Sequence, residues 1–157
     1  MKLILVLSIS LYLAGSLFSL ITLTSEQDLY EAINTKTQDL TAVSTILKNS
    51  NLDINWKTHS GATALMTASF YGHVEIVKLL LAAKANINAT DHNGITALMW
   101  ACFTGNIEIV KLLLAAGADT NIEYKTFFGN GTETALSLAQ QCGHLAIVKI
   151  INSYSGN

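Results

Sequence analysis

Apolar residues recur along this chain at the spacing of short helices, and one such pattern is written twice. Within residues 74–81, the apolar positions follow the three- and four-residue spacing of one helix face, which predicts an amphipathic helix. A shorter helix with a small-residue face is predicted before it, over residues 63–71. The polar stretch at 86–94 is rich in Asn, Asp and Gly, and it predicts a projecting hairpin loop.

Two residues mark the ends of the shorter helix. Thr63 is the predicted N-cap, because its hydroxyl can accept a hydrogen bond from a free backbone N–H at the helix start. Gly72 is the predicted C-terminal end, where a left-handed backbone suits glycine. Each copy is therefore predicted to be a helix, a tight turn, a second helix and a loop.

The same unit returns at a fixed distance along the chain. Residues 75–83 recur unchanged as residues 108–116, and the start of the unit at Gly61 recurs at Gly94 with the same offset. A constant period of this length predicts stacked supersecondary units rather than a closed globule. A more divergent unit precedes the pair, and another follows it after five inserted residues within 124–131. Both outer units are more polar, as is expected of units that cap an array.

The repeated residues resemble the ankyrin repeat. The family pattern of Thr-Pro-Leu-His, Ala and Gly-His before an apolar helix is matched at Thr63-Ala64-Leu65-Met66, Ala68, Gly72-His73 and 74–81. Alanine replaces the family's proline and methionine its histidine, so we expect softer loops. The resemblance covers about four-fifths of the chain. It implies an all-α ankyrin-repeat solenoid of about four helix–turn–helix units over residues 25–157: a capping unit (26–60), two repeats (61–93 and 94–131) and a C-terminal capping repeat (132–157).

An N-terminal hydrophobic segment precedes these units. Residues 3–23 carry no charge, Lys2 stands before them, and acidic residues follow. The stretch is long enough to span a bilayer, which takes about 20 apolar residues. Its charged start, apolar middle and small residues at 14–16 also fit a secretory signal. For residues 1–24 the sequence favours a cleaved signal peptide, while a signal anchor and a buried first helix stay open. Either export segment would place the repeats outside the cytoplasm, in the periplasm, secreted or anchored to the membrane.

Charge, cysteine and histidine content narrow the classes of function. A net charge of −2 favours neither a nucleic acid nor an anionic membrane surface as partner. Cys102 and Cys142 form no Cys-x-x-Cys motif, so two free thiols are predicted. His59 and His92 are one repeat apart, too far to share a metal ion. No nucleophile–histidine–carboxylate grouping is evident. We therefore expect no catalysis, cofactor, metal site or small-molecule substrate.

A surface that binds a protein partner is the remaining candidate. In ankyrin arrays the partner usually contacts the concave face and the loop tips, and the matching positions here are Phe70, Tyr71, Phe103, Thr104, His59 and His92. The three aromatic residues would form a strip across two units, and aromatic anchors carry much of the energy of protein interfaces. Alternatively, the Phe70 side chain packs between helices instead of contacting a partner. Trp100 matches Thr67 and Leu138, and is therefore expected in the core.

The inserted loop offers a second candidate anchor, Phe127-Phe128, which either folds back over the last unit or protrudes toward a partner. Asn130 in the same loop begins an N-glycosylation pattern. The favoured function is an exported ankyrin-repeat module that mediates protein–protein interaction. The alternative is a membrane-anchored structural or protective envelope protein that acts by assembly. The two differ in whether residues 3–23 are removed or retained as a membrane tether.

Overall fold

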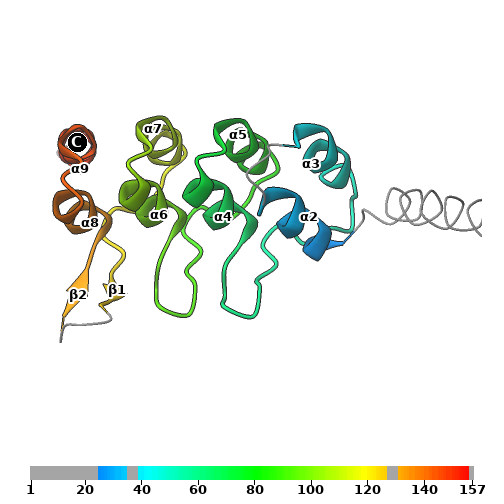
Figure 1. Cartoon of the computed structure of the whole chain (residues 1–157), viewed down its shortest axis with the longest axis horizontal. Coiled ribbons are helices and arrows are strands. Elements are labelled where there is room, and N and C mark those ends of the chain that lie inside the picture. The colour runs from blue at the N-terminus through cyan, green and yellow to red at the C-terminus, as the bar shows by residue number, and fades with distance from the viewer. Residues whose placement is uncertain (1–24, 35–38, 127–130, 156–157) are drawn as a thin grey trace, which may run out of the picture.

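In the part of the chain that the structure describes, four pairs of short antiparallel helices stand side by side (Figure 1). The computed structural model describes residues 25–34, 39–126 and 131–155. The pairs are α2 (Glu26–Ile33) with α3 (Leu40–Ile46), α4 (Ala64–Tyr71) with α5 (Val74–Ala82), α6 (Ala97–Thr104) with α7 (Ile107–Ala115), and α8 (Ala135–Gln141) with α9 (Leu145–Ser155). These elements confirm the predicted helical solenoid. The hydrophobic segment 3–23 lies outside the described residues.

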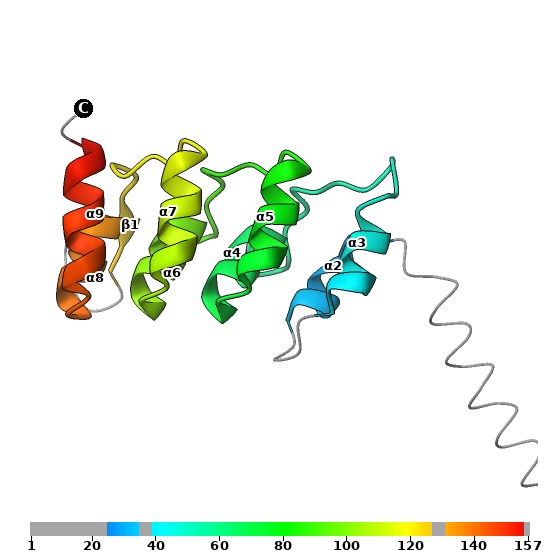
Figure 2. The same cartoon turned by 90° about the horizontal axis from the view of Figure 1, so that it is seen from above.

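The helices form two layers, and the loops project from one of them. Figure 1 shows α2, α4, α6 and α8 in one layer and the second helix of each pair in the other. Figure 2, turned by 90°, shows the helices of each pair alongside those of the next. The loops leave the array on the side of the first helices. The layer of α2, α4, α6 and α8, here called the first-helix layer, is therefore the one that borders the loops.

Threonine caps start the first helices of the two central repeats. The Thr63 hydroxyl accepts from the Met66 N–H at 3.4 Å, and the Thr96 hydroxyl accepts from the Met99 N–H at 3.3 Å. In return, the threonine N–H groups donate to the methionine sulfurs at 3.5 and 3.4 Å. Sulfur is a weak acceptor, but each cap is still reciprocal. The methionine in place of the family's histidine thus keeps a weaker hydrogen bond at this position.

Glycine ends the same helices and makes room for the next unit. Gly72 and Gly105 have φ values of +77° and +79°, as predicted for Gly72. A Cβ on Gly72 would lie 2.7 Å from the Asn106 side chain, and a Cβ on Gly105 would lie 2.6 Å from the His144 ring. Any larger residue at these positions would therefore force the neighbouring side chain to move.

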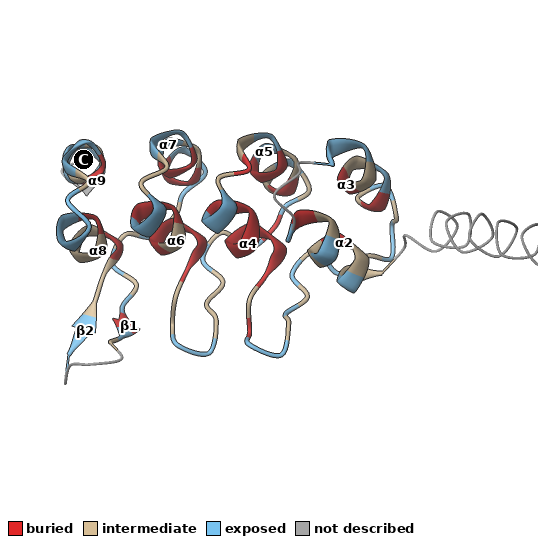
Figure 3. Cartoon of the chain, in the orientation of Figure 1, coloured by how far each residue is buried: buried red, intermediate tan, exposed pale blue. Residues whose placement is uncertain are grey.

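The core runs between the layers and continues across the unit boundaries (Figure 3). The second helices of the two central repeats supply matched side chains with no exposed surface: Ile76, Val77, Leu80, Ile109, Val110 and Leu113. Leu40 in the capping unit is an exception among the large apolar residues of this unit, because it is 37% exposed. It is the first residue of α3 and lines a groove between α3 and α5.

Side-chain amides join the loops of successive units. Asn55 Oδ1 accepts from the Asn86 N–H at 2.7 Å, and Asn88 Oδ1 accepts from the Asp119 N–H at 2.9 Å. These two bonds occupy matched positions in successive units. Displacement of one unit relative to the next would break these hydrogen bonds. The bonds therefore hold the loops at the same spacing as the helices.

The inserted loop contains a short antiparallel ribbon that the sequence did not predict. β1 (Tyr124–Lys125) pairs with β2 (Thr132–Glu133), and Tyr124 lies opposite Glu133. The Tyr124 hydroxyl donates to Glu133 Oε2 at 2.8 Å. The five extra residues lengthen this loop enough for its two arms to pair.

The two cysteines are free thiols in different surroundings, as predicted. Cys102 is buried on α6, whereas Cys142 is exposed at the end of α8. Burial, with a smaller contribution from the nearby Cys142, raises the pKa of the Cys102 thiol to about 12. The reason is that a thiolate loses its hydration in the core.

We expect a thiol reagent at about pH 8 to label native protein at Cys142 alone, because Cys102 is neither accessible nor ionised. The unfolded chain should take up two labels. A Cys142→Ser variant should take up none when native and one when unfolded, as measured by mass spectrometry. Equal labelling rates of both thiols in the native protein would contradict this burial of Cys102.

Candidate functional site

Three aromatic side chains that were predicted to contact a partner are exposed on the first-helix layer. Phe70 and Tyr71 end α4 and are 39% and 40% exposed, and Phe103 on α6 is 48% exposed. Phe103 follows Phe70 by one repeat period, so the stacking of α6 on α4 repeats the ring at the same place in the unit. The structure therefore places these three residues together.

Trp100 joins the rings of the two units. Its centroid lies 5.1 Å from that of Phe70 with an interplanar angle of 83°, and 6.0 Å from that of Phe103 at 84°. Both contacts are edge-to-face, an arrangement that aromatic pairs prefer. Trp100 was expected in the core, but it is only partly buried. An indole is larger than the Thr67 at the matched position, so it extends beyond the core to the surface.

Phe70, Tyr71, Trp100 and Phe103 are here called the aromatic strip. Phe70 also contacts Tyr71 edge-to-face, with a centroid distance of 5.2 Å. The strip is therefore a chain of four rings in mutual contact across two units. Phe70 combines the two roles considered for it, because it packs against α6 and keeps more than a third of its surface exposed.

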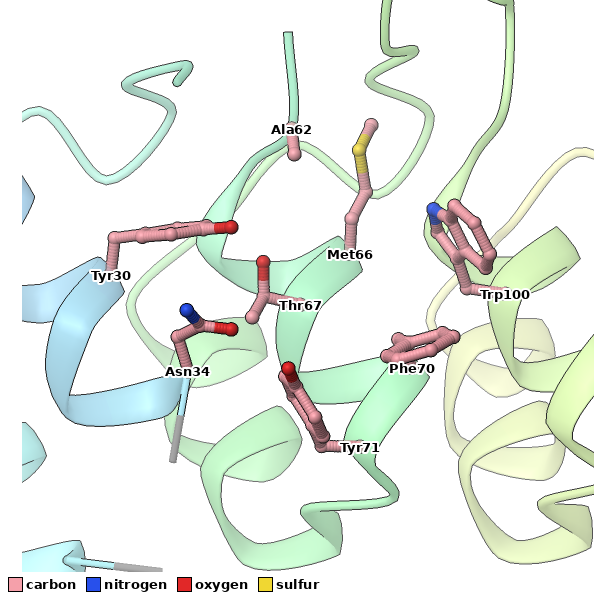
Figure 4. Close-up of a pocket in the computed structure, with 8 residues that line it drawn as sticks. All are labelled: Tyr30, Asn34, Ala62, Met66, Thr67, Phe70, Tyr71 and Trp100. Atoms are coloured by element: carbon pink, nitrogen blue, oxygen red, sulfur yellow. The ribbon is translucent and has the colours of Figure 1, made fainter. Parts of the chain in front are cut away.

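A hollow of about 220 Å³ lies between the capping unit and the aromatic strip (Figure 4). It is lined by Tyr30, Asn34, Ala62, Met66, Thr67, Phe70, Tyr71 and Trp100. In Figure 4, Tyr30 and Asn34 reach from α2 toward Thr67, and Phe70 and Trp100 lie on the other side. The lining residues are aromatic, aliphatic or neutral polar, and none of them carries a charge.

Sequence reasoning missed Tyr30 and Asn34 as parts of this site. The capping unit lacks the repeat motif from which the other positions were inferred. The only available clue was their spacing of four residues, which puts both on one face of α2 beside the core positions Leu29 and Ile33.

Two histidines contact residues of the aromatic strip. The ring of His73, which is buried, stacks on Tyr71 with a centroid distance of 5.7 Å and an interplanar angle of 21°. The His144 Nε2–H donates to the Phe103 carbonyl oxygen at 3.2 Å. Both residues occupy the Gly-His position of their units.

The predicted polar contact residues lie at different places on the protein. Thr104 is exposed at the end of α6, and its hydroxyl donates to the Trp100 carbonyl oxygen at 3.1 Å. His59 and His92 are exposed on successive loops and do not line the hollow. The His92 N–H donates to the Ser60 carbonyl oxygen at 3.3 Å, which ties the two loops together. Phe127 and Phe128 lie outside the described residues.

Among the residues that the structure describes, no three His, Cys, Asp or Glu side chains are grouped to hold a metal ion. Within residues 25–34, 39–126 and 131–155, no helix combines the length and the apolar content needed to cross a bilayer.

Comparison with known families agrees with this geometry. A family model described as ankyrin repeats, in three copies, matches residues 29–124 and 92–156. No curated protein gives a significant match to the chain. The two matched ranges together cover residues 29–156, which include most of the first helix pair and the other three in full. The chain therefore belongs to the ankyrin-repeat family, whose repeats are protein–protein interaction modules and are generally non-catalytic.

Proposed function

We propose that the aromatic strip is the surface with which this ankyrin module binds a protein partner. The observation that carries the proposal is the continuous contact of four partly exposed rings over two units. Because the rings already hold one another in place, binding would cost little loss of side-chain freedom. Aromatic residues in such a patch are frequent hot spots of protein interfaces.

The distribution of exposed apolar side chains supports the same surface. In the described part of the chain, seven large hydrophobic residues are exposed, and Phe70, Tyr71 and Phe103 are three of them. A fourth, Ile107, lies beside them, because it lines a second hollow together with Phe70 and Tyr71. The other three are dispersed over α3 and α9: Leu40, Leu145 and Tyr154. Clustered exposed apolar surface is typical of an interaction site, whereas scattered residues need no explanation.

Polar residues near the strip would complete the interface. Protein interfaces commonly have an apolar centre and a hydrated polar rim. In this proposal Thr104 belongs to the rim, and the loop residues His59 and His92 contact the partner at the loop tips. Phe127-Phe128 would add a second anchor in the inserted loop. The module acts by binding alone, without catalysis, cofactor, metal or small-molecule substrate.

We also propose that the repeats work outside the cytoplasm. The support is the uncharged stretch 3–23, which follows Lys2 and precedes the acidic start of α2. Removal of the stretch would release the module into the periplasm or the medium, and retention would tether it to a membrane. Retention favours the second candidate function, a structural or protective envelope protein that acts by assembly.

We expect simultaneous alanine substitution of Phe70, Tyr71 and Phe103 to abolish capture of a partner, because it removes the exposed rings. Circular dichroism should show unchanged helical content, since all three side chains are largely outside the core. Capture is measured by chemical cross-linking in cells, followed by purification of the chain and mass spectrometry.

The matched control replaces Leu40, Leu145 and Tyr154 by alanine, which removes the same number of exposed apolar side chains away from the strip. This variant should capture the partner as well as the unmodified chain does. Undiminished capture by the strip variant would refute the assignment of the binding surface.

For the location, we expect cell fractionation to recover the chain outside the cytoplasm. N-terminal sequencing should find a mature chain that begins after the small residues 14–16, because cleavage is the favoured fate of the segment. Recovery of an uncleaved chain from the membrane would favour the envelope protein instead. A full-length chain in the cytosol would rule out export altogether.

A further inference from the structure

We propose that the hollow beside the aromatic strip receives a cationic side chain, a lysine or an arginine, from the protein partner. This inference rests on the proposed function, because it assigns the chemistry of one contact within that interface. It follows from three observations: the rings that line the hollow, the oxygen atoms of its lining residues, and the distribution of charge over the first-helix layer.

Four aromatic rings line the hollow, from Tyr30, Phe70, Tyr71 and Trp100. Figure 4 shows them on opposite sides of the space, with Tyr30 reaching from α2 and Trp100 from α6. An ammonium or guanidinium group close to aromatic faces is attracted by the negative charge density of the rings. The long aliphatic stem of lysine or arginine would cover the apolar part of the lining.

Neutral oxygen atoms supply acceptors for the N–H groups of a cation. In Figure 4 the Tyr30 hydroxyl, the Tyr71 hydroxyl and the Asn34 amide point toward Thr67, which also lines the hollow. Lysine and arginine carry only donors, so they need such acceptors when they leave water. A purely apolar side chain in the hollow would displace water from these oxygens without replacing its hydrogen bonds.

The charges of the first-helix layer are all negative. The sequences of α4, α6 and α8 contain no charged residue, and the charged residues of α2 are Glu26, Asp28 and Glu31. By contrast, the second helices α5, α7 and α9 each carry a lysine, at positions 78, 111 and 149. A positively charged group approaching the strip therefore meets carboxylates and no lysine on these helices.

Glu31 is the carboxylate best placed to act on the hollow. Gln27, Tyr30, Glu31 and Asn34 follow the three- and four-residue spacing of one helix face, and Tyr30 and Asn34 line the hollow. Glu31 is exposed, and its Oε1 accepts from Gln27 Nε2 at 3.1 Å. An exposed carboxylate on this face would attract a cation to the opening and repel an anion.

The test uses the full-length chain in a non-ionic detergent, with Trp56→Phe introduced so that Trp100 is the one remaining tryptophan. The Trp100 fluorescence is titrated with two capped tripeptides, Gly-Arg-Gly and Gly-citrulline-Gly. Citrulline has nearly the shape of arginine but no charge. We expect the arginine peptide to bind with a dissociation constant at least about fivefold lower, as cation–π attraction implies.

Two further variants separate charge from shape and folding. Glu31→Gln, an exposed substitution that leaves the core untouched, should weaken binding of the arginine peptide and leave that of the citrulline peptide unchanged. Tyr154→Ala, which removes an exposed ring from α9, should affect neither peptide. Equal affinity for the two peptides, or no response of Trp100 to the arginine peptide, would overturn the assignment of a cation. The proposed function would then still be judged separately, by partner capture with the strip variant.

Discussion

The packing of each helix pair against its neighbours is the interaction on which the rest of this structure depends. Helices of seven to eleven residues are too short to be stable alone in water. Ile76, Leu80 and Leu113 lose all exposed surface because successive units cover one another. The hydrogen bonds that the side-chain amides of Asn55 and Asn88 accept hold the loops at the same spacing as the helices. Stability in this array is therefore shared between units rather than contained within them.

The candidate site is a product of the same packing. Phe70 and Trp100 meet edge-to-face because α6 lies beside α4, and the hollow exists because α2 brings Tyr30 opposite Phe70 (Figure 4). No single unit contains the strip or the hollow. A substitution that shifts one unit would therefore alter the binding surface as well as the stability. This coupling explains how a stack of short repeats can present a specific surface.

Features set by local chemistry were predictable from the sequence, and features set by neighbouring units were not. The constant repeat period, the Thr63 cap and the Gly72 end can be recognised in the residues themselves, so the units and their boundaries were predicted. The position of Trp100 depends on Phe70, one unit away. Likewise, the roles of Tyr30 and Asn34 depend on how the capping unit docks on α4. The β1–β2 ribbon depends on how the two arms of the inserted loop pair. The inserted residues have no counterpart in the other units from which this pairing could be predicted.

Equilibrium unfolding of Leu80→Ala tests the central claim most directly. The substitution leaves a cavity at a fully buried contact, and it should lower the free energy of unfolding by about 2–5 kcal/mol. Because the units support one another, urea titration followed by circular dichroism should still show a single transition for the whole array. Lys111→Ala, at an exposed position of α7, serves as the control. A separate early transition that removes only α4 and α5 would contradict the account.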